Sequence, residues 1–241
     1  MEPKIEIIHE PTRTEPFVVV KKPKNLPSAP LVLGDPSAYS QCENLFPELK
    51  NVSGKKAVEH GLVHRIDTET DGLLLIASNQ SFYDWIQNVQ SSGGFLKQYT
   101  AICHIDSEKN DSSFPEPPFW GPPESMPAKI ESLFRFYGPK NACVRPVTDC
   151  SSRIVQKKAS GTLYKTSLDS VEKIEGGVKV RCSIERGFKH QVRCHLAWCG
   201  LSVYGDKKYS RMDDGCELKF SATALTFPLE NGRTFHIELD Q

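Results

Sequence analysis

The chain of 241 residues lacks several features that would assign it to a class at once. No apolar run approaches the roughly 20 residues that a membrane-spanning helix needs. The first residues carry neither the basic and apolar pattern of a secretory signal nor the arginine-rich pattern of a transit peptide. Because 30 basic and 30 acidic side chains balance, neither sign of charge dominates. We therefore expect a globular, cytoplasmic protein that is a monomer and has no membrane partner.

Metal-ligand spacing is also missing. None of the eight cysteines forms a Cys-x-x-Cys pair, and we interpret them as reduced thiols, several of them in the core. His60 with His64, and His190 with His195, resemble metal-binding pairs, but no third ligand accompanies either pair. The sequence therefore predicts no metal site.

The most informative segment that is present runs from His64 to Gly72 and reads His-Arg-Ile-Asp-Thr-Glu-Thr-Asp-Gly. It stands directly before the apolar stretch 73–77, which is typical of a buried strand. Gly72 permits the backbone to turn back toward the core. Ionisable groups beside a buried strand favour a functional site, and the alternative is a solvated turn.

A calcium loop is a second interpretation of this segment. Asp67, Glu69, Asp71 and Gly72 match the opening of an EF-hand loop. The twelfth position, where a bidentate glutamate belongs, is Ser78, and the residues before it are apolar. This mismatch argues against calcium.

Hydrophobic periodicity predicts an α+β fold with many antiparallel strands and a few interspersed helices. We expect one domain, 1–241, with a proline-rich surface insertion at 106–127. The predicted strands are 5–8, 17–21, 73–77, 95–103, 129–137, 142–147, 161–168, 178–184, 222–227 and 234–239, and the predicted helices are 38–49, 80–89 and 190–199.

Two of these elements place candidate residues on one face. In the strand 95–103, Lys97 and Tyr99 share a face and point into the same cavity. In the helix 190–199, Val192 and Leu196 belong to an apolar stripe that is expected to face the core.

Taken together, four motifs in order resemble the RluA-type family of RNA pseudouridine synthases, over nearly the whole chain. The resemblance implies the pseudouridine synthase fold, an α+β fold with a mixed, mostly antiparallel central sheet, flanking helices and a central active-site cleft. We expect the catalytic domain alone, without the S4 RNA-binding domain that many relatives carry. The motifs are the strand ending in Lys22-Pro23, His64-Arg65-Ile66-Asp67 with Thr70-Asp71-Gly72, Lys97-Gln98-Tyr99, and Gly187-Phe188-Lys189-His190-Gln191-Val192-Arg193.

The resemblance implies an isomerase that converts uridine in structured RNA, ribosomal or transfer, to pseudouridine. Such a reaction neither adds nor removes an atom, so no cofactor is needed. Asp67 is implied to be the catalytic carboxylate, with Arg193 as its cationic partner and Tyr99 against the uracil ring. The family's substrate and RNA contacts correspond to Arg65, Lys97, His190, Gln191, Val192 and Leu196.

Each role has a plainer alternative. Arg65 is the candidate for filling the gap that a flipped base leaves, or it forms a surface ion pair with Glu69 or Asp71. The alternative for Arg193 is an ion pair with a purely structural role. The alternative for Tyr99 is a side chain packed in the core. The chain has Phe188 where the family commonly has arginine, and Asp71 where it has serine.

Two other functions are compatible with the sequence. A protein with the same fold that binds RNA without catalysis is the first alternative, and a glycoside hydrolase that releases the base is the second.

Basic residues between 185 and 211, together with Arg145, Arg153, Lys157 and Lys158, predict a basic stripe for phosphate contacts.

Overall fold

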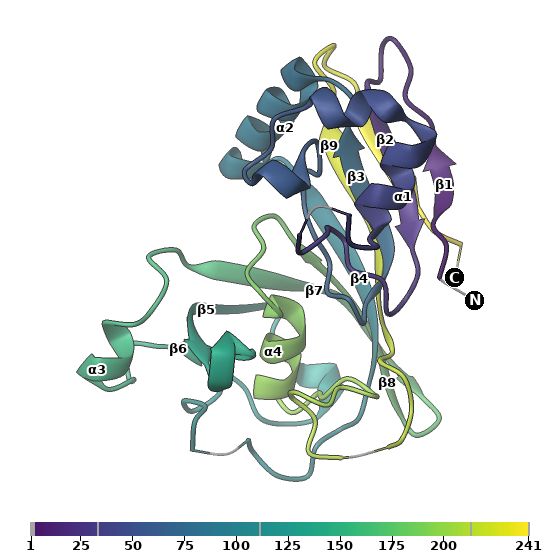
Figure 1. The fold of residues 1–241 in the computed structure, drawn as a ribbon. Coiled ribbons are helices and arrows are strands. Elements are labelled where there is room, and N and C mark those ends of the chain that lie inside the picture. The colour runs from purple at the N-terminus through teal and green to yellow at the C-terminus, as the bar shows by residue number, and fades with distance from the viewer. Residues whose placement is uncertain (1–2, 33, 111, 213, 241) are drawn as a thin grey trace. The chain divides into compact units, whose positions relative to one another are not determined.

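A computed structural model describes residues 3–32, 34–110, 112–212 and 214–240 (Figure 1). The chain divides into two compact units. The first combines Met1–Lys97 with Ser221–Gln241, and the second consists of Gln98–Phe220. Each unit contributes its own run of paired strands and has its own core.

Unit 1 contains a sheet with the strand order β1-β2-β3-β9, to which β10 adds by pairing with β9. The β3–β9 pair is parallel and the other pairs are antiparallel. Its elements are β1 (Glu6–His9), β2 (Phe17–Lys22), α1 (Ala38–Leu45), η1 (Pro47–Asn51), η2 (Ala57–Glu59), β3 (Asp71–Ala77), α2 (Gln80–Ser92), β9 (Phe220–Pro228) and β10 (Thr234–Glu238).

The core of unit 1 lies between this sheet and α2 (Figure 1). Phe82 of α2 stacks on Phe17 of β2 at a centroid distance of 4.8 Å, and Phe227 of β9 completes the aromatic cluster. Because β2 and β3 are buried almost throughout, they read as continuous apolar runs rather than as alternating ones.

Local capping explains where the helices of unit 1 begin and end. Ser37 and Ser40 form a capping box at the start of α1. The helix predicted over 38–49 ends at Leu45, because Pro47 cannot continue it and opens the short helix η1 instead. Asn79 caps α2, and Gly93 ends it in the left-handed conformation with φ of 87°.

Unit 2 contains the strand order β4-β8-β7-β5-β6. The β8–β7, β7–β5 and β5–β6 pairs are antiparallel. Its elements are β4 (Leu96–Cys103), η3 (Pro123–Ser125), β5 (Lys129–Tyr137), η4 (Pro139–Asn141), β6 (Cys143–Val147), α3 (Arg153–Gln156), β7 (Tyr164–Ile174), β8 (Gly177–Ile184) and α4 (Gln191–Trp198). The strand β4 begins at the end of unit 1.

The helix α4 packs against β6 and β7 (Figure 1). Val192 and Leu196 of the predicted apolar stripe are buried, and so are the other six residues of the helix. Its polar side chains are therefore satisfied by internal hydrogen bonds. His195, for example, contacts the hydroxyls of Ser132 and Thr166 at 2.9 Å each.

The segment 106–127, which the sequence predicts to be a surface insertion, contains little regular structure. Among its described residues, only Pro123–Ser125 forms a short helical turn. Trp198 of α4 donates its ring N–H to the Pro115 carbonyl at 2.8 Å, and Phe114 packs on the core of unit 2. These contacts hold the insertion to unit 2.

The α+β class and the mixed, mostly antiparallel pairing are confirmed. The predicted strand 161–168 is shifted, since β7 runs from Tyr164 to Ile174, and α3 was not predicted. All eight cysteines are unpaired, and five are buried. None of the helices in the described ranges has the length and apolar character to cross a membrane.

Candidate active site

The loop that carries Asp67 is held in place by hydrogen bonds to its backbone. Ser28 binds both backbone groups of Ile66, accepting from its N–H at 3.1 Å and donating to its carbonyl at 2.7 Å. The Thr70 N–H donates to the Asp67 carbonyl at 3.1 Å and closes a turn. The half-buried Asp67 side chain is therefore presented from a loop whose neighbouring backbone is fixed.

Lys22 supports the same loop from β2. Its ammonium is fully buried and donates to three carbonyls, those of Pro23 at 2.8 Å, Leu26 at 2.7 Å and Thr68 at 3.1 Å. Burial lowers the pKa of Lys22 to about 8, opposed by the charges of Asp71 and Asp67. Lys22 thus places a positive charge close to the candidate catalytic carboxylate.

His64 lies at the start of the motif and is neutral. The Leu75 N–H donates to its Nε2 at 3.3 Å, which leaves the ring proton on Nδ1. Burial, with a further contribution from the charge of Lys97, lowers the pKa of His64 to about 3. The histidine therefore binds the backbone of β3 at Leu75 without adding a charge to the site.

Asp71 and Gly72 connect the motif to β9. The Ser221 hydroxyl donates to the Asp71 carboxylate at 2.8 Å. Gly72 has φ of 121°, and a Cβ at this position would lie 2.1 Å from the Ala222 carbonyl oxygen. The predicted turn at Gly72 is wrong, because Gly72 lies inside β3 and the turn precedes it at residues 68–69. Its positive φ and the close approach of β9 allow only glycine at this position.

Arg65 is exposed over 57% of its side chain. Its ion pair is with Glu59, at 2.8 Å, so the predicted partners Glu69 and Asp71 are wrong. Glu59 and Asp71 are equally far from Arg65 in the chain, at six residues each, and it is the helix η2, which ends at Glu59, that presents its carboxylate to Arg65.

Arg193 lies on α4 in unit 2 and is 2% exposed. Its Nε and Nη2 donate to the two carboxylate oxygens of Asp206, each at 2.7 Å. Asp206 also accepts the backbone N–H groups of Lys208 and Tyr209. This bidentate geometry fixes the plane of the guanidinium. The predicted pairing of Arg193 with Asp67 stays a prediction, because the two residues belong to different units.

Gln191 and His190 are both anchored at the start of α4. The Gln191 amide donates to the Lys165 carbonyl at 2.8 Å and accepts from the Phe188 N–H at 2.9 Å. His190 adopts the left-handed conformation with φ of 53°, and its Nδ1 is 2.9 Å from the Tyr209 hydroxyl. Val192 and Leu196 are buried on the same helix. Substrate contact by these four residues stays a prediction.

The strand β4 carries Lys97 and Tyr99 on its buried face, as the alternation predicted. Tyr99 stacks on Phe220 with a centroid distance of 5.2 Å and an angle of 6° between the rings. Lys97 is 4% exposed, and its ammonium lies 4.5 Å from the centre of the Phe95 ring.

Two residues of this arrangement were missed by the sequence prediction, namely Lys22 as a support of the loop and Asp206 as the partner of Arg193. Lys22 stands in the Lys22-Pro23 motif, but that motif carries no sign of its partner Thr68, which lies 46 residues further along the chain. Asp206 lies 13 residues after Arg193. Within the described residues, no group of three or more histidine, cysteine or acidic side chains is arranged to hold a metal.

Solved structures share this fold. Human RNA pseudouridylate synthase domain containing 4 superposes with a TM-score of 0.65 at 19% identity, covering 97% of this chain and 87% of that chain. Human RNA pseudouridylate synthase domain containing 1 superposes with a TM-score of 0.64 at 17% identity, covering 100% of this chain and 86% of that chain.

Residues 16–198 match the family model described as RNA pseudouridylate synthase. The chain therefore belongs to the RNA pseudouridylate synthase family, and the predicted RluA-type resemblance is confirmed.

Relatives by sequence carry corresponding names. The human mitochondrial pseudouridylate synthase RPUSD4 is 26% identical over 231 residues, which are 92% of this chain and 57% of that protein. The uncharacterized RNA pseudouridine synthase YlyB of Bacillus subtilis is 25% identical over 162 residues, covering 67% and 44%. Ribosomal large subunit pseudouridine synthase C of Escherichia coli is 24% identical over 155 residues, covering 62% and 41%. The chain spans about half the length of these relatives.

Proposed function

We propose that the chain is an RNA pseudouridine synthase that isomerises uridine in a structured ribosomal or transfer RNA. The observation that carries the proposal is the family match over residues 16–198, which includes Asp67 and its supporting loop. The name of the Escherichia coli relative supports ribosomal RNA as the first substrate to test.

The proposed reaction is balanced within the nucleotide. The bond between the ribose C1′ and the uracil N1 breaks, the base turns, and C1′ bonds to the uracil C5. The proton that C5 loses is replaced by one on N1, so no atom is gained or lost. A hydrolase would need two cooperating carboxylates and an admitted water, whereas this reaction needs one carboxylate and a site that excludes water.

Asp67 acts at the sugar in this proposal, as nucleophile or as base, and must be ionised in either role. The buried ammonium of Lys22 places a positive charge near Asp67, since the two charges interact. Arg193 supplies a second positive charge and Tyr99 lies against the uracil. A stacked uridine must first be flipped out at a cost of a few kcal/mol, and Arg65, whose guanidinium is exposed, is the residue proposed to fill the gap.

A nucleoside analysis tests the proposal. Transcribed RNA labelled in its uracil rings is incubated with the full chain, digested to nucleosides and resolved. Pseudouridine is the expected product. An RNA-binding protein without catalysis gives no product, and a glycoside hydrolase releases free uracil, so either result overturns the proposal. Mapping modified positions in total RNA from cells with and without the protein identifies the substrate. The cytoplasmic location and monomeric state stay predictions.

A further inference from the structure

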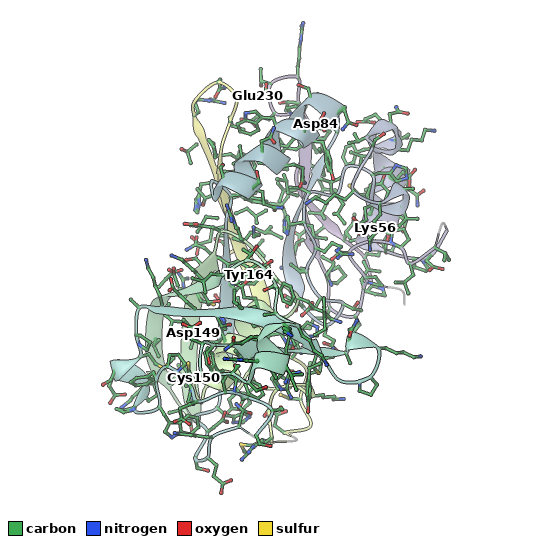
Figure 2. The ribbon with its side chains drawn as sticks, turned by 90° about the vertical axis from the view of Figure 1, so that its left-hand side faces the viewer. Lys56, Asp84, Asp149, Cys150, Tyr164 and Glu230 are labelled. Atoms are coloured by element: carbon green, nitrogen blue, oxygen red, sulfur yellow. The ribbon has the colours of Figure 1, made fainter. Side chains whose placement is uncertain are left out.

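Four aromatic side chains of unit 2 gather on one face of the β5 strand. We call Phe134, Phe136, Tyr164 and Phe188 the aromatic cluster. Phe188 stacks on Phe134 at 5.3 Å with an interplanar angle of 6°, and its centroid lies 5.4 Å from Phe136 and 5.1 Å from Tyr164. Tyr164 stands at the start of β7 and is labelled in Figure 2.

The cluster is buried at one end and open at the other. Phe134 is fully buried and packs on α4, whereas Phe136 keeps 50% of its surface exposed. An aromatic ring that packs against other rings and remains half exposed to solvent is suited to stacking on a planar ligand.

The chain around the cluster is strongly basic, although the whole chain is neutral. Between Ser132 and Leu168 the only acidic residue is Asp149, and it is labelled in Figure 2. The seven basic residues of this stretch are Arg135, Lys140, Arg145, Arg153, Lys157, Lys158 and Lys165. Arg145, which the sequence predicted for a basic stripe, is instead buried between the Phe114 and Tyr137 rings.

Backbone contacts hold exposed lysines of this stretch near the cluster. The N–H and carbonyl of Phe134 both bond to Ser160, which follows the exposed Lys157 and Lys158. On the other side, Lys189, next to Phe188, donates to the Asn141 carbonyl at 2.8 Å, beside the exposed Lys140.

We propose that this surface binds a single-stranded segment of the RNA, with an unpaired base stacked on Phe136 and with Lys140, Lys157 and Lys158 contacting the neighbouring phosphates. Half-exposed aromatic rings flanked by positive charges are the general means of binding unpaired nucleotides without sequence preference. The inference rests on the proposed function, because it assigns the surface to the RNA that this enzyme would modify.

Substitution of Phe136 tests the stacking. The probe is a short, fluorescently labelled single-stranded RNA of mixed sequence, and its affinity is measured by anisotropy with the full chain. Phe136→Leu is expected to weaken binding roughly tenfold, and Phe136→Trp to retain it, since base stacking needs an aromatic ring. A purely apolar or structural role predicts that leucine serves as well as phenylalanine, and that result overturns the stacking. Leu45→Ala in unit 1 is the control, because Leu45 is 59% exposed.

Substitution of the lysines tests the phosphate contacts. In the Lys157→Ala/Lys158→Ala variant, the slope of log affinity against log salt is expected to fall by about 1 to 1.5, since each phosphate contact on a single strand contributes about 0.7. The control is Lys50→Ala/Lys55→Ala, with two exposed lysines of unit 1. An unchanged slope overturns the assignment, and circular dichroism confirms that each variant is folded.

The two proposals fail in different ways. If the unchanged chain forms pseudouridine and all variants bind RNA as it does, the surface assignment is wrong and the function stands. If the variants lose RNA affinity but the unchanged chain forms no pseudouridine, the function is wrong and the RNA-binding surface stands.

Discussion

Arg193 and Asp206 form a two-point ion pair in which both side chains are almost fully buried, at 2% and 0% exposure. Removing one partner of such a pair leaves an uncompensated buried charge. Asp206→Ala is therefore expected to lower the free energy of unfolding by about 3–5 kcal/mol, measured by urea denaturation.

A double variant separates the structural contribution of this pair from catalysis. In Arg193→Met/Asp206→Leu no charge remains buried, so stability is expected to recover most of what Asp206→Ala loses. The double variant is nevertheless expected to form no pseudouridine, because Arg193 is a catalytic residue of the proposed function. A stable and fully active double variant would contradict that role.

Asp67→Asn is expected to abolish turnover and to leave the fold intact. The amide keeps the size of the side chain but carries no negative charge, so it serves neither as nucleophile nor as base. Nucleoside analysis measures the product, and circular dichroism with thermal melting measures the fold. Asp71→Asn is the matched control, because Asp71 accepts a hydrogen bond from Ser221 that asparagine also accepts. Undiminished activity of Asp67→Asn removes Asp67 from the mechanism.

Lys22 gives the stability a defined dependence on pH. Its pKa in the folded chain is about 8, below the value of 10.5 for a free lysine. Between these values the unfolded chain binds more protons than the folded chain, so this group makes the free energy of unfolding rise with pH. At lower pH, where both states are protonated, its contribution is constant.

The comparison of the unchanged chain with Lys22→Met isolates this contribution. The unfolding free energy of the unchanged chain minus that of Lys22→Met is expected to rise by roughly 2 kcal/mol from about pH 7.5 to about pH 9.5. Lys21→Met is the control, since the adjacent Lys21 side chain is 43% exposed. Parallel pH curves for Lys22→Met and the unchanged chain would show that Lys22 is not perturbed.

Gly72 provides a test of the motif's backbone. Gly72→Ala combines a positive φ with a Cβ 2.1 Å from a backbone oxygen, so we expect a loss of more than about 2 kcal/mol of stability. Gly232→Ala is the control, because it has φ of 81° but no atom within 4 Å of the added Cβ, and about 1 kcal/mol is expected. Equal losses in the two variants would mean that the contact with Ala222 is relieved by small shifts.

Elements with strong local signals were predictable from the sequence. The alternation along 95–103 placed Lys97 and Tyr99 on the buried face. The strands predicted over 222–227 and 234–239 correspond to β9 and β10, which pair antiparallel. The helix predicted over 38–49 extends past the observed end of α1 at Leu45, because the apolar pattern continues beyond Pro47. Pro47 is visible in the sequence, and its effect on the helix should have set the boundary.

The site was predictable in its residue types and not in its supporting contacts. The motif around Asp67 stands in one short segment, so it could be recognised directly. The partners of Lys22 are backbone carbonyls, among them that of Thr68, and a sequence motif carries no sign of them. Arg193 and Asp206 are adjacent only because the chain returns after α4, and Glu59 reaches Arg65 through η2.

The three carbonyls around Lys22 use every proton of its ammonium. The Lys22 side chain is also fully buried, so an amine-directed acylating reagent does not reach this nitrogen while the loop is closed, although it modifies the many lysines at the surface. Acylation at position 22 requires the carbonyl of Thr68 to move away, so its rate measures how often the segment bearing Asp67 opens.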